Sequence, residues 1–203
     1  ERSKRKKDTG QFDKITDIFS AKSAASIIRR DIFNAIGGFD NDFYMYLEET
    51  DLSWRVWLSG YRVVFIPRAV VYHAFGSAKK ELKSEVYYPK YVVRYYGCRN
   101  YIITLIKNLE LKNLIKILPL HIFAWCIIAF FFSLKAKFQD CYYVVKGIGW
   151  NIFNLRIVMA KRKKVQKEIR TVPDKFIMQR VLSKEKLSSY LKKIFIYTCA
   201  QQT

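Results

Sequence analysis

Residues Gly37 to Gly76 read GGFDNDFYMYLEETDLSWRVWLSGYRVVFIPRAVVYHAFG, and this stretch decides which fold we expect the chain to have. Apolar residues recur at helical spacing over residues 50–58 and a glycine follows, which predicts a short helix with a defined end. Three carboxylates, Glu48, Glu49 and Asp51, lie at and before the first turn of this helix. The positive end of a helix dipole favours such negative charge, so helix capping is the simplest interpretation of the cluster.

Strand signals surround the predicted helix. Residues 62–66 are β-branched and end at a proline, and residues 69–72 form a second short strand signal. Upstream, residues 18–28 predict a buried strand that leads into a turn. Residues 29–36 predict a short helix, with Gly37 where a left-handed helix end is expected. The alternation of strands and helices predicts an α/β layer.

The charge of the 203-residue chain is unevenly distributed. Residues 1–78 carry 12 basic and 10 acidic side chains, whereas residues 79–203 carry 25 and 7, so nearly all of the net charge of +20 lies in the second part. A basic region of this kind suits a polyanion such as nucleic acid, an anionic membrane surface or a phosphorylated substrate. We therefore expect two regions, residues 1–78 and 79–203.

The second region contains an apolar run that suits a membrane. Residues 101–118 predict a helix, and residues 117–134 hold no formally charged side chain. As a helix this uncharged run would be roughly 27 Å long, just short of a hydrocarbon core. Lysines flank the run and residues 135–203 are strongly basic, which opposes export of that segment. We expect a re-entrant or interfacial placement at an anionic membrane surface; a hairpin with residues 144–160 and a buried core helix are the alternatives.

The cysteine pattern favours a reducing compartment. None of the four cysteines forms a CxxC pair, and the positions of Cys98, Cys126, Cys141 and Cys199 fit neither a zinc site nor a disulfide framework. The first ten residues, ERSKRKKDTG, lack the apolar segment of a signal peptide. These features favour the cytoplasmic face of the cell membrane.

The order of several short motifs resembles a known enzyme family. The motifs are DTGQFD, SAASIIRR, GGFDNDFYMY, LEETDLSWR, SGYRVVFIP and AVVYH, between about Asp8 and Ser77. Together they resemble the C-terminal half of the catalytic domain of inverting family-2 glycosyltransferases, in particular the rhamnosyltransferase-like members. The resemblance implies an α/β fold, namely the acceptor-side half of a GT-A (Rossmann-like) domain in residues 1–78. It also implies a mainly α-helical membrane-associated tail in residues 79–203.

The resemblance assigns the reaction to the acidic cluster. The family usually has Glu-Asp-x-Asp-Leu where this chain has residues 48–52, so Glu49 holds the position of the family's general base. A base there takes the proton from an acceptor hydroxyl as that oxygen attacks the anomeric carbon. Glutamate is one methylene longer than aspartate, which displaces the carboxylate by about 1 Å, enough to matter for a positioned base. Either the backbone at Glu49 is shifted or Glu48 shares the task, and Asp51 completes the implied catalytic cluster.

The resemblance also implies substrate-binding and metal-binding residues. Ser23 and Ala24 lie where the family has a Gly-Ala segment near the acceptor site, and Arg55 belongs to the same implied set. Because Arg55 follows Asp51 by four residues, we expect these two mainly to pair and to hold the acidic turn. His73 matches the family's histidine near the nucleotide diphosphate, which ligates the metal in some members.

The implied cofactor is a divalent cation, Mg²⁺ or Mn²⁺. In the family it is held mainly by an Asp-x-Asp motif in the N-terminal, donor-binding half, which we expect to be absent from these 203 residues. Asp40 and Asp42 fit Asp-x-Asp on paper. They belong instead to the GGFD loop, an acceptor-side and structural element, so we do not assign them to the metal.

The implied activity is transfer of a sugar, with inversion, from a nucleotide sugar such as dTDP-rhamnose to a glycan or lipid-linked acceptor in cell-surface polysaccharide synthesis. A basic membrane-surface protein with an inactive catalytic fragment is one alternative. A nucleic-acid-binding protein is another, because basic grooves with aromatic side chains bind single strands. The basic residues are interleaved with the apolar run and no RRM-, KH- or helix-turn-helix-like motif is present, so we expect no nucleic-acid partner.

Overall fold

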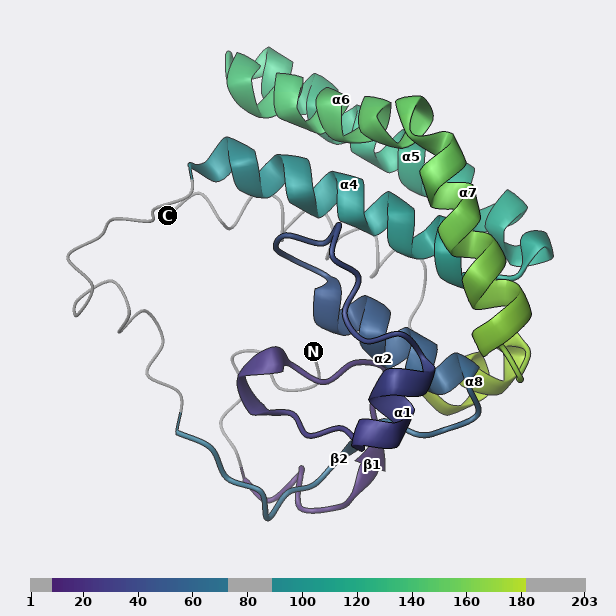
Figure 1. Cartoon of the computed structure of the whole chain (residues 1–203). Coiled ribbons are helices and arrows are strands. Elements are labelled where there is room, and N and C mark those ends of the chain that lie inside the picture. The colour runs from purple at the N-terminus through teal and green to yellow at the C-terminus, as the bar shows by residue number, and fades with distance from the viewer. Residues whose placement is uncertain (1–8, 73–88, 182–203) are drawn as a thin grey trace.

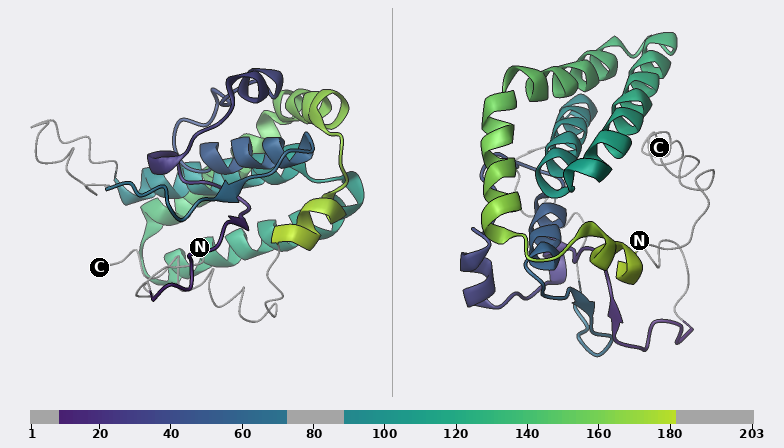
Figure 2. Two further views of the ribbon diagram at one scale, coloured as in Figure 1. Left: turned by 90° about the horizontal axis from the view of Figure 1, so that it is seen from below. Right: turned by 90° about the vertical axis from the view of Figure 1, so that its right-hand side faces the viewer.

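The computed structural model describes residues 9–72 and 89–181. Three long helices form a layer, and a smaller part with short helices and little strand packs beneath it (Figures 1 and 2). The layer consists of α4 (Lys90–Asn108), α5 (Leu111–Leu134) and α6 (Phe138–Phe153). The chain then runs from the layer down to the smaller part (Figure 1) through α7 (Leu155–Lys164), the π-helical turn η2 (Val165–Ile169) and α8 (Asp174–Val181).

The smaller part contains β1 (Thr16–Asp17), the 3-10 turn η1 (Ser23–Ala25), α1 (Arg30–Ala35), α2 (Glu48–Leu58) and β2 (Val64–Phe65). The two strands pair antiparallel, with Thr16 opposite Phe65 and Asp17 opposite Val64. Within the described residues, this ladder is the whole of the β-structure. The expected GT-A half-domain therefore stays a prediction.

The strand expected over residues 18–28 does not form. The amide of Ile18 still bonds to Val63 at 3.0 Å, but the chain then turns onto α2. There the indole of Trp57 donates to the carbonyl of Ile18 at 3.1 Å, and the hydroxyl oxygen of Ser53 accepts from the amide of Ala21 at 3.3 Å. Residues 22–27 are exposed, as are residues 69–72, where the second expected strand is also missing. Side chains of α2 thus bond to the carbonyl of Ile18 and the amide of Ala21, where a strand would need a neighbouring strand.

The two short helices of the smaller part confirm their sequence signals. The helix α2 includes the expected residues 50–58 and begins two residues earlier, at Glu48. It ends at Gly60, whose φ of +85° is left-handed, and the amide of Tyr61 bonds back to Val56 at 3.2 Å. This pairing is the Schellman arrangement, in which glycine avoids the strain of a side chain. The helix α1 ends in the same way before Gly37, which has a φ of +80°.

The helix expected over residues 101–118 is interrupted, so that prediction is wrong. Leu109 and Glu110 adopt extended backbone between α4 and α5. The amide of Glu110 donates to Asp174 at 2.8 Å, and the amide of Asp174 donates back to Glu110 at 3.1 Å. Arg162 donates to the carbonyl of Leu109 at 2.7 Å, so side chains from distant α7 and α8 cap both helix ends.

Two clusters of buried apolar side chains hold the molecule together. One lies within the layer and is built from α4, α5, α6 and the loop residue Phe43. The other lies in the smaller part, between α1, α2, η2 and α8. Trp54 of α2 packs against both clusters. The start of α2 therefore sits at the junction between the layer and the smaller part.

The close crossing of α4 and α6 depends on one glycine. A β-carbon on Gly147 would lie 3.0 Å from the carbonyl oxygen of Tyr95 and 3.2 Å from the amide nitrogen of Arg99. Contacts this short to backbone leave no room for a side chain, so the two helices touch through their main chains. Asn151, one turn later, donates to the carbonyl of Arg99 at 3.3 Å and reinforces the crossing.

The uncharged run lies within α5, which passes through Pro119. Among the described helices, α5 is long and apolar enough to cross a membrane by length and composition, and 11% of its most apolar 18-residue window is buried. Large apolar side chains are exposed on α5 and continue onto α6. We call them the apolar face: Leu111, Ile115, Leu120, Phe123, Ile127, Phe130, Leu134, Phe138, Tyr142, Val145, Ile152 and Phe153.

Candidate functional site

The three predicted carboxylates share the first turn of α2. The chain enters this turn through Tyr46 and Leu47, with φ of +64° and +68°. Left-handed backbone is unfavourable for residues other than glycine, by about 1–2 kcal/mol each, so surrounding contacts must hold it. We call residues 46–51 the acidic turn. Its main contact is to α4, from the part of the chain that the sequence sets apart as a tail.

Asn100 of α4 holds the backbone of the acidic turn. Its side-chain amide donates to the carbonyl of Met45 at 2.7 Å and to that of Tyr46 at 3.0 Å. The side chain is fully buried. One amide group therefore satisfies two consecutive carbonyls at the point where the chain turns left-handed, and this fixes the direction in which α2 begins.

Asp51 is fully buried and is surrounded by donors. Its Oδ2 accepts from Nε of Arg55 at 2.9 Å and from Nζ of Lys107 at 2.9 Å, and its Oδ1 accepts from the amide of Asn108 at 2.9 Å. The expected pairing of Asp51 with Arg55 is confirmed. Arg55 also donates to the carbonyl of Ile36 at 2.6 Å, and only 3% of it is exposed. This geometry makes the pair a buried support of the acidic turn, since a buried charge is tolerated when an opposite charge pairs with it.

The GGFD loop is tied to the same cations. Asp40 lies 2.7 Å from Nζ of Lys107 and also pairs with Lys161 of α7. Asp42 lies 2.6 Å from Nζ of Lys161. Burial would raise the pKa of Asp40, but the two lysines outweigh it and lower that pKa to about 2. With lysines as their neighbours, Asp40 and Asp42 have the environment of ion-pair partners.

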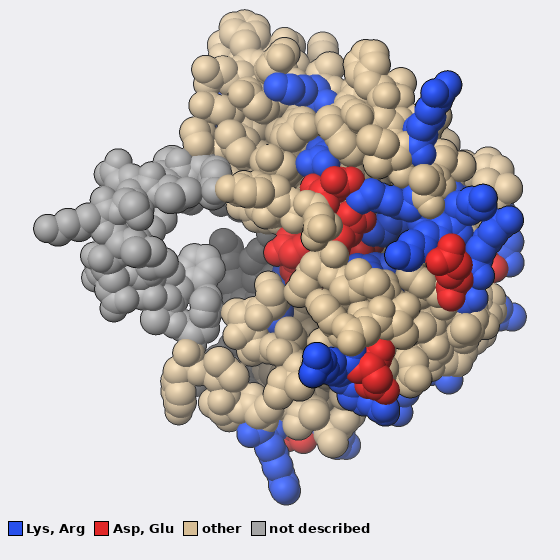
Figure 3. Space-filling model, in the orientation of Figure 1, with Lys and Arg blue, Asp and Glu red and all other residues tan. Residues whose placement is uncertain are grey.

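Glu48 and Glu49 do not take part in the buried hydrogen bonds and ion pairs that Asp51 and Asp40 form with α2, α4 and α7. Glu49 is 14% exposed, and its Oε1 lies 3.3 Å from Nζ of the exposed Lys22. Glu48 has one buried oxygen, Oε2, with no hydrogen-bond partner among the described residues. Figure 3 shows acidic side chains gathered on one face beside Lys and Arg side chains. Of the predicted cluster, Glu49 is placed to meet a ligand from solvent, whereas Asp51 is enclosed.

Ser23 and Ala24 directly follow Lys22, whose ammonium group lies 3.3 Å from Glu49. They belong to the exposed turn η1, which follows Lys22 directly. The segment before them lies on the first turns of α2, because Ser20 contacts Thr50 at 3.4 Å. The structure thus brings the predicted substrate-binding turn and the predicted base to one side of α2. His73, the predicted metal ligand, lies outside the described residues.

Sequence reasoning missed the contribution of α4. Asn100, Thr104, Lys107 and Asn108 occupy one face of the helix and are all buried. Their spacing of four, three and one residues is a helical stripe of polar side chains inside an otherwise apolar segment. A polar stripe on a buried face needs polar partners, so the sequence did hold a signal that this helix packs against another charged element.

The described residues, 9–72 and 89–181, contain no cluster of three or more side chains of the metal-binding types that could hold an ion. Asp40 and Asp42 are neutralised by lysines rather than left open. The expected Mg²⁺ or Mn²⁺ stays a prediction.

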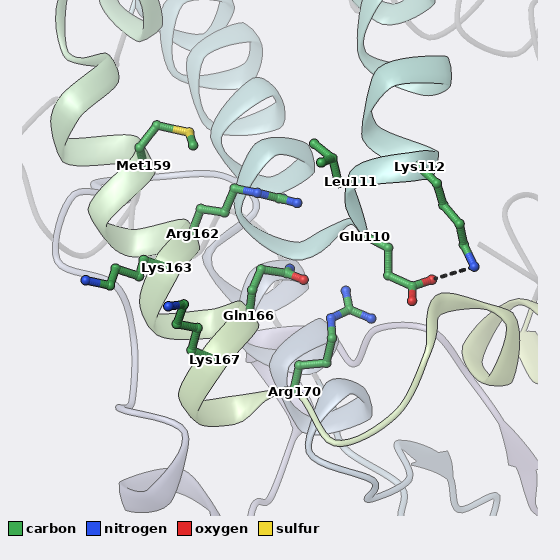
Figure 4. Close-up of a pocket in the computed structure, with 9 residues that line it drawn as sticks. All are labelled: Glu110, Leu111, Lys112, Met159, Arg162, Lys163, Gln166, Lys167 and Arg170. Carbon is green, nitrogen blue, oxygen red and sulfur yellow. Dashed lines mark ion pairs between the residues drawn. The ribbon is translucent and has the colours of Figure 1, made fainter.

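A separate basic pocket lies between α5, α7 and η2 (Figure 4). Its cavity volume is about 510 Å³. Arg170 on its wall donates to the carbonyls of Val172 and Asn108, and it pairs with Asp174 at 2.9 Å. Much of this positive charge is thus used to cap the end of α4. The lining residues are Glu110, Leu111, Lys112, Met159, Arg162, Lys163, Gln166, Lys167 and Arg170.

Comparisons with known proteins match one short segment. The relatives are N-acetylglucosaminyl-diphospho-decaprenol L-rhamnosyltransferases of Mycobacterium tuberculosis, from the CDC 1551 / Oshkosh and ATCC 25618 / H37Rv strains. Each is 40% identical over 47 residues, which cover 23% of this chain and 15% of the relative. No family model and no solved structure matches the chain. Over the matched segment the chain is similar to a rhamnosyltransferase, which supports a glycosyltransferase-like character and no finer class.

Proposed function

We propose that this chain is the acceptor-side part of an inverting glycosyltransferase that uses a nucleotide sugar. The sugar goes to a glycan or lipid-linked acceptor at the cytoplasmic face of the membrane, for synthesis of a cell-surface polysaccharide. The rhamnosyltransferase names of the short matches make dTDP-rhamnose the first donor to test. The observation that carries the proposal is the acidic turn, in which Glu49 reaches the surface while Asp51 below it is locked in place.

In the proposed reaction Glu49 is the general base. The acceptor hydroxyl oxygen forms a bond to the anomeric carbon while the bond from that carbon to the nucleotide diphosphate breaks. The hydroxyl proton moves to the Glu49 carboxylate, and the nucleotide diphosphate leaves with the electron pair of the broken bond. Attack from the side opposite the leaving group inverts the anomeric centre. The ammonium group of Lys22 lies 3.3 Å from Oε1 of Glu49 at the surface, so in the proposed reaction the acceptor hydroxyl replaces this contact.

The buried hydrogen bonds around Asp51 support this role because they hold the acidic turn in one position. Asp51 is bonded to Arg55, Lys107 and Asn108, while Asn100 fixes the backbone just before Glu48. A base that is misplaced by about 1 Å loses much of its catalytic effect, so a rigid support is what a catalytic carboxylate needs. We also propose Mg²⁺ or Mn²⁺ as the cofactor for the leaving diphosphate, with its ligands outside the described residues.

We further propose that the helical layer lies on an anionic membrane. The apolar face covers α5, which at 24 residues is about 36 Å long, and continues onto α6. The turn between α5 and α6 carries Lys135 and Lys137, and Lys112 lies in the first turn of α5 at its other end. Lysines at both ends of an apolar helix suit an orientation parallel to the membrane plane, where each reaches the phosphate level.

A transfer assay tests the enzyme proposal. The complete gene product is incubated with labelled dTDP-rhamnose and a short-chain N-acetylglucosaminyl-diphospho-prenol, and other nucleotide sugars serve as alternative donors. We expect Glu49→Gln to lower kcat by about 10²–10⁴-fold and Asp42→Asn to act more mildly. Equal losses from the two variants would contradict the assignment of the base. A protein of these 203 residues alone is expected to transfer little sugar, and robust transfer by it would overturn the proposed division of labour.

A binding assay tests the membrane proposal. Vesicles that contain a third of phosphatidylglycerol should bind the protein, and phosphatidylcholine vesicles should bind it less. Replacement of Phe123, Ile127 and Phe130 by serine should weaken binding without loss of helicity, because these side chains are exposed on α5. Binding to single-stranded oligonucleotides without any to anionic vesicles would favour the nucleic-acid alternative instead.

A further inference from the structure

The segment 43–46, which leads into the acidic turn and ends at its first residue, carries two exposed tyrosines. Phe43 is buried, with 6% exposed, and anchors the loop in the core of the helical layer. Tyr44 is 62% exposed and Tyr46 is 44% exposed. The loop thus buries one aromatic ring and leaves two others partly exposed, close along the chain to Glu48 and Glu49.

The ring of Tyr44 rests on a built support. It lies 5.5 Å from the ring of Tyr96 on α4, tilted by 36°, and Tyr96 contacts Tyr95 at 5.0 Å. Arg99 lies beneath, 5.7 Å from the ring centre of Tyr96 and 3.9 Å from that of Trp150. Only 7% of Arg99 is exposed, so a buried cation and three further rings hold this tyrosine in position.

The position of Tyr46 is fixed through its backbone. Its carbonyl accepts from Asn100 at 3.0 Å, and its backbone has a left-handed φ of +64°. Glu48 follows two residues later and Glu49 three residues later. We call these two partly exposed tyrosines, which precede the two glutamates closely along the chain, the tyrosine rim (Tyr44 and Tyr46).

We propose that the tyrosine rim is the binding site for a pyranose ring of the acceptor. This inference rests on the proposed function and adds the substrate subsite to it. One face of a pyranose is lined by C–H groups and packs against an aromatic ring, while its hydroxyls project sideways as donors. Neighbouring carboxylates accept such hydrogen bonds, and charge-assisted bonds are the stronger kind. A neutral sugar therefore satisfies both the rings and the acids.

Other occupants fit this place less well. A nucleotide would bring its phosphates close to Glu48 and Glu49, where like charges repel. A membrane would have to reach past α4, which lies between the loop and α6, whereas the apolar face is on α5 and α6 (Figure 1). The sugar of the acceptor is the remaining ligand that the proposed reaction must hold next to its base.

The test is a kinetic comparison in the complete gene product, with the donor and acceptor named above. We expect Tyr44→Ala/Tyr46→Ala to raise the acceptor KM by about tenfold, with far smaller changes in kcat and in the donor KM. The Phe variants of both residues should recover most of the affinity, because they keep the rings. Tyr61→Ala is the matched control, since Tyr61 is 46% exposed at the opposite end of α2. An unchanged acceptor KM, or equal increases for the Phe and Ala variants, would overturn the proposal.

A binding readout separates this proposal from the proposed reaction. Saturation-transfer NMR with methyl β-N-acetylglucosaminide measures contact between the sugar and the protein without any turnover. The signal should be lost in the Ala double variant and kept in the Phe variants and in Glu49→Gln. If Glu49→Gln retains transfer while the Ala variant loses the signal, the base assignment fails and the tyrosine rim stands. Loss of vesicle binding in the Ala variant, with the sugar signal intact, would assign the rings to the membrane and overturn the proposal.

Discussion

The ammonium group of Lys107 lies 2.9 Å from the carboxylate of Asp51, and both side chains are almost completely buried. Lys107 belongs to α4, on the basic side of the change in composition, whereas Asp51 belongs to the acidic side. Lys107 also reaches Asp40 at 2.7 Å. The helix that begins the expected tail thus supplies the counter-charge for the candidate catalytic turn, so the helical layer and the turn are expected to unfold together.

We expect Lys107→Met to destabilise the protein by about 3–5 kcal/mol, because it leaves Asp40 and Asp51 buried without their shared cation. Urea denaturation followed by circular dichroism measures this change. Lys112→Met is the matched control, since the side chain of Lys112 is 70% exposed and its contact with Glu110 is 3.6 Å long. A loss below 1 kcal/mol for Lys107→Met would show that the buried pair is not formed in solution.

Patterns within one segment could be predicted from the sequence, whereas contacts between residues far apart in the sequence could not. The helix at α2 and its glycine stop follow from spacing within one segment, as does the pair formed by Asp51 and Arg55. The break between α4 and α5 depends instead on Asp174, which lies 64 residues from Glu110. The expected strand at residues 18–28 failed for a similar reason, because α2 offered its backbone other partners. At both places the local preference for helix or strand is overridden because a side chain distant in the sequence bonds to the backbone.

Asn100 offers a test of how the acidic turn is positioned. Asn100→Asp keeps the size of the side chain but removes the amide that donates to Met45 and Tyr46. We expect a loss of about 1–3 kcal/mol in stability and a fall in kcat for sugar transfer that exceeds the change in KM. Asn154→Asp, which removes a 2.9 Å bond to Trp150 at the end of α6, is the control. If Asn154→Asp lowers kcat as much at matched stability, Asn100 has only a structural role.

The ion pairs of Asp40 predict an acid-sensitive contribution to stability. The pKa of this carboxyl is lowered from 3.8 to about 2, with burial opposing the shift and Lys107 and Lys161 dominating it. A lowered folded-state pKa stabilises the native state above the unfolded value, and this contribution is lost as the pH falls through the folded value. The difference in unfolding free energy between the unchanged protein and Asp40→Asn should therefore be constant above about pH 5 and shrink between about pH 4 and 2. A difference that stays constant across that range would contradict the ion pairs.

The cysteines of the helical layer allow a direct test of membrane contact. Cys126 is exposed on α5, whereas Cys98 is buried in α4, where burial raises the pKa of its thiol and makes it unreactive. In a Cys141→Ser/Cys199→Ser background, a maleimide should label Cys126 alone in the folded protein. Anionic vesicles should slow this labelling severalfold if α5 lies in the interface, while urea should open Cys98 to the reagent. Labelling of Cys126 at an unchanged rate on saturating vesicles would place α5 away from the membrane.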